Sequence, residues 1–591
     1  MVVSGKTPNS KMKPKYLWLL CLITLVEGIS VQVVLWGMTF DPGRGNILNY
    51  ATLRLILSGV IALTLIALTV FMIGLFRKIG WGSRLSALLD KQLTGTKKRL
   101  FFIQGVLLIL AFFLGECFLM TYLAFPVPMR PVFLWAALIC LQVWLVLRIA
   151  YAGLYRQRPS LVARMRTKWT EARPVQRKVF IVVAILGLLY FAAFIPVNLL
   201  RDQYGNFFVH GDEKVVYPEV TNALISQNSF SREVHALIES WGWQYGYPYF
   251  SASALVLAIP RLIFGNQFID HVQLNIFLLR QFISVLPMVL SLLLAVYLIT
   301  DYKSMAKSVG IFIFLALVPG ILKNNVRFWH PDSLIVLTVV LTIYFLKKDN
   351  LRFGRNFYLA AVFCGLAAAI KLWGLFFGLA IAGYLLAGLI QKKLTFGKMI
   401  LYGLLFMLAM FGAIILSSPS LMAPYIGRVA LRGWLPRQGF LLHGYDPGND
   451  LDAYAFYETG LANWLEYFGY HFMKGYFFCF SFIALFIGSL WGAKVRLNRI
   501  LLGWCTVTAA FLIYFVALKN FQYMLPLAVP LYCGAFLFPA ITVDENALPK
   551  RLSFLAKPPA NKIIWGVTIT MVASQLIINL VILYLYALRG R

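Results

Sequence analysis

Charged residues are scarce in this chain of 591 residues, and apolar residues are abundant. Asp, Glu, Lys and Arg make up only 13% of the sequence, against about a quarter in ordinary soluble domains. Hydrophobic residues make up 60%, where about half is usual. This balance excludes an ordinary soluble globular protein and indicates a chain that is solvated by lipid.

Cysteine pairs and nucleotide-binding motifs are also lacking. The seven cysteines lie inside or at the ends of apolar runs, and no two of them form a CxxC pair. The sequence therefore offers no disulfide framework and no zinc site. It has no Walker A sequence and no convincing Rossmann fingerprint, so no nucleotide site is predicted. We predict no cofactor; a divalent metal is possible, but the sequence does not indicate one.

Long apolar runs fill most of the sequence. Runs of about 17 to 25 apolar residues, each long enough to cross about 30 Å of hydrocarbon, recur from Tyr16 to Leu588 and number about fifteen. The run 16–39 is too long for a signal peptide, and no cleavage site follows it. The stretch 357–390 is too long for one helix, so we predict two helices with a break near 371–374. The sequence predicts an all-α polytopic membrane protein.

The distribution of charge predicts the orientation of these spans. The net charge is +32, and an amino terminus in the cytoplasm puts about 35 of the 54 Lys and Arg in cytoplasmic segments. The same arrangement leaves only about 6 of the 22 acids there. The basic surplus therefore predicts topology and not nucleic-acid binding. We expect a multi-pass protein with a cytoplasmic amino terminus, in the plasma (inner) membrane if the cell is prokaryotic.

Three regions follow from the predicted spans. Residues 1–177 hold four spans, 178–541 form a membrane core, and 542–591 contain a cytoplasmic loop and the last helix. Two long polar segments of the core, about 201–276 and 418–474, lie on the non-cytoplasmic side and are predicted to carry juxtamembrane helices. These segments gather acidic residues, so the outer face is the predicted working face.

Asp212 and Glu213 follow the fifth predicted span and form the strongest candidate for chemistry. Adjacent carboxylates repel one another at a membrane surface, which favours a proton on one of them. Such a group can act as a general base and take a proton from a hydroxyl group. Alternatively, both acids stabilise the first turn of a short surface helix. Local sequence leaves both roles open.

A second candidate is the outer turn that contains Arg327, His330 and Asp332. His330-Pro331-Asp332 is typical of a helix start, with proline and an acid in the first turn. Arg327 suits an anionic lipid headgroup, because its planar paired donors match phosphate oxygens. Asp332 is available to a substrate in the same turn.

Lys371 and the turn before Tyr523 complete the candidates. Lys371 lies at the outer end of a predicted helix, where it either reaches the membrane surface or binds a phosphate. Gln522 and Tyr523 belong to a polar turn between two apolar helices, a position that needs polar residues in any case. His443 lacks metal-ligand spacing, and such a lone histidine is often a hydrogen-bonding loop residue.

Taken in order, these segments resemble the GT-C superfamily of glycosyltransferases. The resemblance covers about residues 178–541, in the branch of the protein O-mannosyltransferases and the lipid A aminoarabinose transferase. It rests on the order, spacing and predicted side of Asp212-Glu213, Tyr245-Gly-Tyr-Pro-Tyr-Phe250, Leu262-Ile-Phe-Gly265, the turn 327–332, Gly365-Leu-Ala-Ala-Ala-Ile-Lys371 and Asn520-Phe-Gln-Tyr-Met-Leu-Pro526. It implies a GT-C-like helix bundle of about fifteen spans.

The resemblance implies an inverting transferase that takes mannose or a related sugar from a dolichyl or undecaprenyl phosphate. The acceptor is a protein, a glycolipid or a polysaccharide. The resemblance implies that Asp212 and Glu213 are catalytic carboxylates. The ligands of the donor phosphate would be Arg327, Lys371, Gln522 and Tyr523. The substrate ligands would be Tyr247, His330, Asp332 and His443.

Two other classes stay open at this stage, a polytopic transporter or lipid flippase and a ligase or polymerase of surface polysaccharide. A transporter is favoured by inverted repeats and by charges deep in several helices, and neither is convincing here. A transferase mechanism requires Asp212, Arg327, Lys371 and the turn before Tyr523 to converge at the outer face.

Overall fold

A computed structural model of the chain describes residues 93–121, 133–144, 170–200, 207–225, 236, 245–422, 459–540 and 558–588, with short gaps inside these ranges. The chain divides into two compact units. The first contains Met1–Glu171 and two short later segments, and the second contains the rest of the chain.

The described part of the first unit centres on helix α4 (Leu93–Met120). Its segment Ile103–Met120 is long and apolar enough to cross a membrane. This agrees with the prediction of membrane spans within residues 1–177. The predicted run 16–39 lies outside the described residues.

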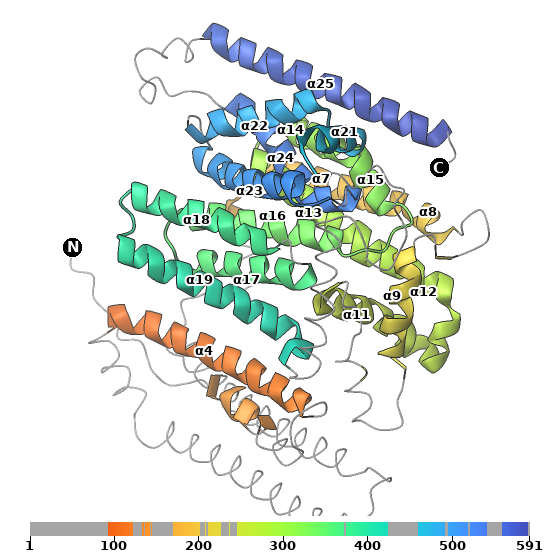
Figure 1. The fold of residues 1–591 in the computed structure, drawn as a ribbon, viewed down its shortest axis with the longest axis vertical. Helices are drawn as coiled ribbons and strands as arrows, with labels where there is room; N and C mark the ends of the chain where they lie inside the picture. Colours follow the sequence, from red (N-terminus) through yellow and green to blue (C-terminus); the bar gives the residue numbers. More distant parts are fainter. Residues whose placement is uncertain are drawn as a thin grey trace, which may run out of the picture. The chain divides into compact units, whose positions relative to one another are not determined.

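The second unit is a bundle of helices (Figure 1). They are α7 (Pro174–Ala193), α8 (Ile195–Leu199), α9 (Gly211–Asn222), α11 (Tyr247–Phe264), α12 (Val272–Leu279), the π-helical turn η3 (Arg280–Val285), α13 (Leu286–Thr300), α14 (Met305–Ala316), α15 (Pro319–Asn325), α16 (Asp332–Asp349), α17 (Arg355–Ile370), α18 (Gly374–Ile390), α19 (Phe396–Ser417), α21 (Leu461–His471), α22 (Gly475–Leu490), α23 (Val495–Tyr514), α24 (Phe521–Leu537) and α25 (Pro558–Leu588).

The described residues form helices and no strands, as an all-α membrane protein requires. Seven described helices are long and apolar enough to cross a membrane, or nine if each of two bent helix pairs is one span. The chain therefore has the helices of a multi-pass membrane protein. The number of about fifteen spans stays a prediction.

Helix α24 lies at the centre of the second unit. Nearly all of its residues are buried, and it packs against α16, α22 and α23. An apolar helix with no polar face is expected in such a position, because every side of it meets protein. Gln522 and Tyr523 belong to the first turn of α24, and both are buried.

The long apolar stretch 357–390 folds as two helices, as its length predicts. Helix α17 ends at Ile370 and α18 begins at Gly374, so Lys371 follows the end of α17 directly. The stretch 248–264 is short for a span and contains Pro260, so it is predicted as a juxtamembrane or re-entrant helix. It forms helix α11, and the segment Tyr247–Asp270 is long and apolar enough to cross a membrane.

The bundle has two distinct ends (Figure 1). Helices α8, α9, α11 and α12 gather at one end, and the connection between α18 and α19 lies at the other. Helix α16 runs between these ends, from Asp332 to Asp349. Its 18 residues span about 27 Å, close to the hydrocarbon thickness of a bilayer.

Candidate functional site

The turn before α16 is fixed by side chains from two other elements. The backbone N–H of Trp329 donates to Oε1 of Glu213 in α9 over 2.9 Å. The backbone N–H of His330 donates to Oγ of Ser284 in η3 over 3.2 Å. These bonds satisfy buried backbone groups that regular structure leaves unpaired. They also fix the position of His330 just before Asp332, the first residue of α16.

A glycine brings Tyr245 to the end of α17. The N–H of Gly246 donates to the carbonyl oxygen of Ile370 over 2.9 Å. A Cβ atom at this position would overlap the carbonyl oxygen of Ala369, so only glycine allows the approach. Because Ile370 precedes Lys371, this contact places Tyr245 beside that lysine.

Four polar side chains from distant segments form a continuous chain of contacts around Tyr245. The Tyr245 hydroxyl lies 3.0 Å from Oδ2 of Asp212 and 2.6 Å from Nε2 of His330. His330 Nδ1 contacts Oδ2 of Asp332, and Oδ1 of the same carboxylate lies 3.1 Å from Nζ of Lys371. His330 and Asp332 are fully buried, whereas 29% of the Asp212 side chain is exposed. Asp212 therefore lies at the mouth of the cluster.

Burial decides the protonation states in this cluster. It lowers the pKa of His330, and the nearby Asp332 carboxylate only partly opposes this shift, so the imidazole is neutral. A neutral ring that donates from Nδ1 to Asp332 must accept at Nε2. Burial also raises the pKa of Tyr245 well above its usual value, so its hydroxyl keeps its single proton. Tyr245 can donate that proton either to His330 or to Asp212.

Helix α24 contributes the remaining two contacts. Nε2 of Gln522 lies 3.3 Å from Nε2 of His330. Nζ of Lys371 lies 4.3 Å from the ring centroid of Tyr523 and 5.8 Å from that of Tyr245. A cation over aromatic faces is stabilised by their electron density. The lysine is thus held by one carboxylate and two rings.

Glu213 faces away from this cluster and forms a buried salt bridge. Its carboxylate binds Arg280 through both oxygens, at 2.8 Å to Nε and 2.6 Å to Nη2. Both side chains are almost completely buried. The adjacent carboxylates therefore have different surroundings, because Glu213 is neutralised by an arginine while Asp212 contacts a neutral tyrosine.

Arg327, a predicted phosphate ligand, contacts α8 instead. Its backbone N–H donates to Oδ1 of Asn198 over 2.7 Å, and its Nε donates to the carbonyl oxygen of Val197 over 3.3 Å. Its φ of 50° is in the left-handed region, which a residue other than glycine rarely adopts. The cluster around Tyr245 thus contains Lys371 but not the Arg327 side chain. Of the four groups expected to converge, Asp212, Lys371 and the turn before Tyr523 do so and Arg327 does not.

Most of the predicted site residues lie in or next to the cluster around Tyr245. The cluster brings together Asp212, His330, Asp332, Lys371, Gln522 and Tyr523. Tyr247, a predicted substrate ligand, is the first residue of α11 and is half-buried. His443 lies outside the described residues.

Two residues at the site were absent from the predicted set. Tyr245 was recognisable only as part of an aromatic motif, and sequence alone did not favour it over Tyr247. Arg280 carried a clearer signal, because it is a charged residue in an otherwise apolar run. Such a residue usually faces a partner inside the bundle.

The burial of Glu219 predicts that the stability of the fold depends on pH. It lies seven residues after Asp212 in α9, and its buried Oε2 accepts no hydrogen bond from any described residue. Burial raises its pKa from 4.5 to about 7. The folded state therefore favours the neutral acid. The contribution of this neutral acid to the stability of the fold is lost as the pH rises from about 4.5 through about 7.

We expect Glu219→Gln to remove this loss, because glutamine is neutral at every pH. The difference in melting temperature, variant minus wild type in one detergent, should grow between pH 4.5 and about 7 and then level off. Asp270→Asn, which alters an exposed carboxylate, is the matched control. A Glu219→Gln difference that stays constant across this range would contradict the prediction.

The described residues contain no group of three or more His, Cys, Asp or Glu side chains arranged to hold a metal ion. The groups available for chemistry are one partly exposed carboxylate, a neutral tyrosine, a neutral histidine, and a lysine paired with a buried carboxylate. No protein-family model matches this chain, and no curated protein matches it either.

Proposed function

We propose that the chain is an inverting glycosyltransferase that moves a sugar from a polyprenyl phosphate to an acceptor at the non-cytoplasmic face of the membrane. The observation that supports this most is the cluster around Tyr245. It joins residues from five separate parts of the sequence, and six of these residues are among those that the sequence predicts for the site. A general base and a cation close together are what transfer from a phosphate donor needs.

Asp212 is the proposed base, because it is the carboxylate at the mouth of the cluster. In the transfer step the acceptor oxygen forms a bond to the anomeric carbon of the sugar. The bond from that carbon to the phosphate oxygen breaks, and its electron pair leaves with the polyprenyl phosphate. The acceptor proton passes to Asp212. Attack from the side opposite the leaving group inverts the anomeric centre.

Tyr245 connects the proposed base to a buried acceptor of hydrogen bonds. While Asp212 is ionised, the Tyr245 hydroxyl can donate to it over 3.0 Å. Once Asp212 is protonated, Tyr245 can turn its proton toward Nε2 of His330 and accept a hydrogen bond from the new acid. The tyrosine thus stabilises both protonation states of Asp212 without a charge change of its own.

Lys371 is the proposed ligand of the donor phosphate. The leaving phosphate gains negative charge in the transition state, and a nearby ammonium group stabilises that charge. An ammonium group carries three donors, so it can bind Asp332 and a phosphate oxygen together. Asp332 acts by positioning, since it holds Lys371 and the His330 ring at once.

The direction of the bundle supports the proposed side of the membrane. Asp212 and Asp332 lie at the end where α16 begins. Lys347 and Lys348 occupy the last turn of α16, about 27 Å away. Basic residues favour the cytoplasmic side, so the cluster belongs to the opposite face. We place it in a GT-C-like core at residues 178–541.

The proposal is tested by a transfer assay with the purified full-length chain. Mannosyl phosphoryl undecaprenol and the corresponding dolichyl donor are each supplied with a peptide, a glycolipid or a polysaccharide acceptor. We expect acceptor-dependent release of polyprenyl phosphate and a product of inverted anomeric configuration. Movement of the intact donor across a vesicle membrane without transfer favours a flippase. Retained configuration in the product would contradict the proposed mechanism.

A further inference from the structure

A cavity lies at the end of the bundle opposite the candidate site. It has a volume of about 180 Å³ and is lined by residues of α16, α18 and α23 and of the turn after α16. An engineered cavity of about 150 Å³ accepts benzene, so a phosphate group fits the larger volume. Leu346 and Asn350 belong to its wall, at the far end of α16 from Asp332. It is therefore a separate site.

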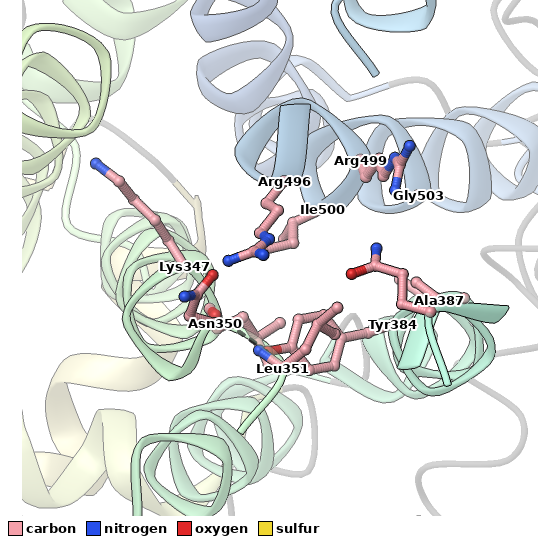
Figure 2. Close-up of a pocket in the computed structure, with 13 residues that line it drawn as sticks. Lys347, Asn350, Leu351, Tyr384, Ala387, Arg496, Arg499, Ile500 and Gly503 are labelled. Carbon is pink, nitrogen blue, oxygen red and sulfur yellow. Dashed lines mark hydrogen bonds between the residues drawn. The ribbon is translucent and has the colours of Figure 1, made fainter. Parts of the chain in front are cut away.

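Two arginines give this cavity its charge. Arg496 and Arg499 lie in the first two turns of α23, and both line the cavity. Arg496 extends from α23 toward Asn350 (Figure 2). Nε of Arg499 donates to the carbonyl oxygen of Ser489 over 2.8 Å, which fixes the position of that guanidinium. The positive end of the α23 dipole adds to the same field.

The other charged groups nearby are bound within the fold. Lys347 also lines the cavity, but its nitrogen points away (Figure 2) and lies 2.9 Å from Asp301. The buried Asp349 carboxylate accepts backbone N–H groups from Arg352 and Gly354 and the hydroxyl of Tyr384. Two arginines against the single carboxylate of Asp349 leave a net positive charge around the cavity.

The inner wall of the cavity is apolar. Ala380, Gly383 and Ala387 of α18 face Ile500 and Gly503 of α23 across it. A Cβ atom added at Gly383 meets nothing within 4 Å, so this glycine borders open space. A polar rim with two arginines above an apolar wall suits an amphiphile whose charged group is a phosphate.

We propose that this cavity binds a phosphate group through Arg496 and Arg499, and that the natural ligand is an anionic phospholipid of the same leaflet. The bidentate donors of arginine match phosphate oxygens. The small residues of α18 and α23 leave room for the glycerol backbone and the start of the acyl chains. This site lies on the opposite side of the hydrocarbon from the proposed transfer reaction and is independent of it.

The test measures stabilisation of the full-length chain in a neutral detergent, since a ligand that binds only the folded state raises its melting temperature. The probes are dioleoylphosphatidylglycerol, dioleoylphosphatidylcholine and inorganic phosphate. We expect stabilisation by phosphatidylglycerol and not by phosphatidylcholine. In the double variant Arg496→Gln/Arg499→Gln, the apparent dissociation constant for phosphatidylglycerol should rise at least about tenfold. The control Arg352→Gln alters an exposed arginine outside the cavity and should leave it unchanged.

A second pair of variants keeps all charges and tests whether binding needs the open volume of the cavity. Gly383→Leu fills the cavity and should weaken phosphatidylglycerol binding by a similar factor. Gly378→Leu places the same side chain in open space on the same helix, outside the cavity, and should not. Arginine-dependent stabilisation by inorganic phosphate alone would support the phosphate site and overturn the lipid assignment. Equal binding by wild type and both cavity variants would overturn the site itself.

Discussion

Replacing Asp212 by asparagine is expected to lower the rate of sugar transfer by about 10² to 10⁴-fold, the usual contribution of a general base. Asparagine has the same shape, and its carbonyl oxygen can still accept the hydrogen bond from Tyr245. The variant therefore keeps the cluster but cannot take the acceptor proton. The loss should appear in kcat, with little change in the KM for the polyprenyl-phosphate donor.

The matched control for this variant is Asp270→Asn. Asp270 is an exposed acid in the same predicted outer segment, so its loss changes the surface charge equally without touching the cluster. We expect the control to keep the wild-type rate. A melting temperature within one or two degrees of wild type shows that Asp212→Asn is folded. Undiminished transfer by that folded variant would rule Asp212 out as the base.

The features that sequence predicted well are those set by the length and periodicity of apolar runs. A bilayer fixes how many residues one helix can use, so the stretch 357–390 had to break, and the break falls beside Lys371. The start of α16 was predictable for a similar local reason, because proline and an acid favour a first turn. Both predictions needed no knowledge of neighbouring helices.

The composition of the candidate site depended on long-range order. Asp212, His330, Lys371 and Gln522 share no local pattern, so each is a candidate within its own segment and only the family resemblance joins them in one site. Apolar periodicity shows which face of a helix is buried but not which helix covers it. The contact of Tyr245 with His330 and Asp212 depends on the close approach of Gly246 to α17, which no sequence pattern predicted.

Arg327 shows a different limit of prediction from sequence. Its charge and position suggested a phosphate ligand, but the side chain binds a carbonyl oxygen of α8. The reason is its left-handed backbone, with a φ of 50°, in a turn that also donates to Asn198. Such a conformation is typical of glycine, and an arginine in the sequence gives no sign of it.

Glu213 is expected to act by positioning and stability, in contrast to its neighbour Asp212. Glu213→Gln leaves Arg280 buried without its counter-ion, and breaking such a pair costs about 3–5 kcal/mol. The melting temperature in detergent should therefore fall strongly. Arg280→Met should have a similar effect, since it leaves the carboxylate unpaired. The two single variants remove the same interaction from opposite sides.

The double variant Glu213→Gln/Arg280→Met separates this explanation from general damage to the core. Once the arginine is gone, the carboxylate has no counter-ion to lose, so the second substitution should cost much less than it does alone. Costs that add would show that the pair contributes no interaction energy. Glu213 also accepts the Trp329 N–H that fixes the turn of His330, so Glu213→Gln should lower kcat as well. Because Asp212 remains, the pH dependence of that residual activity should keep the wild-type shape, whereas loss of the base in Asp212→Asn should change it.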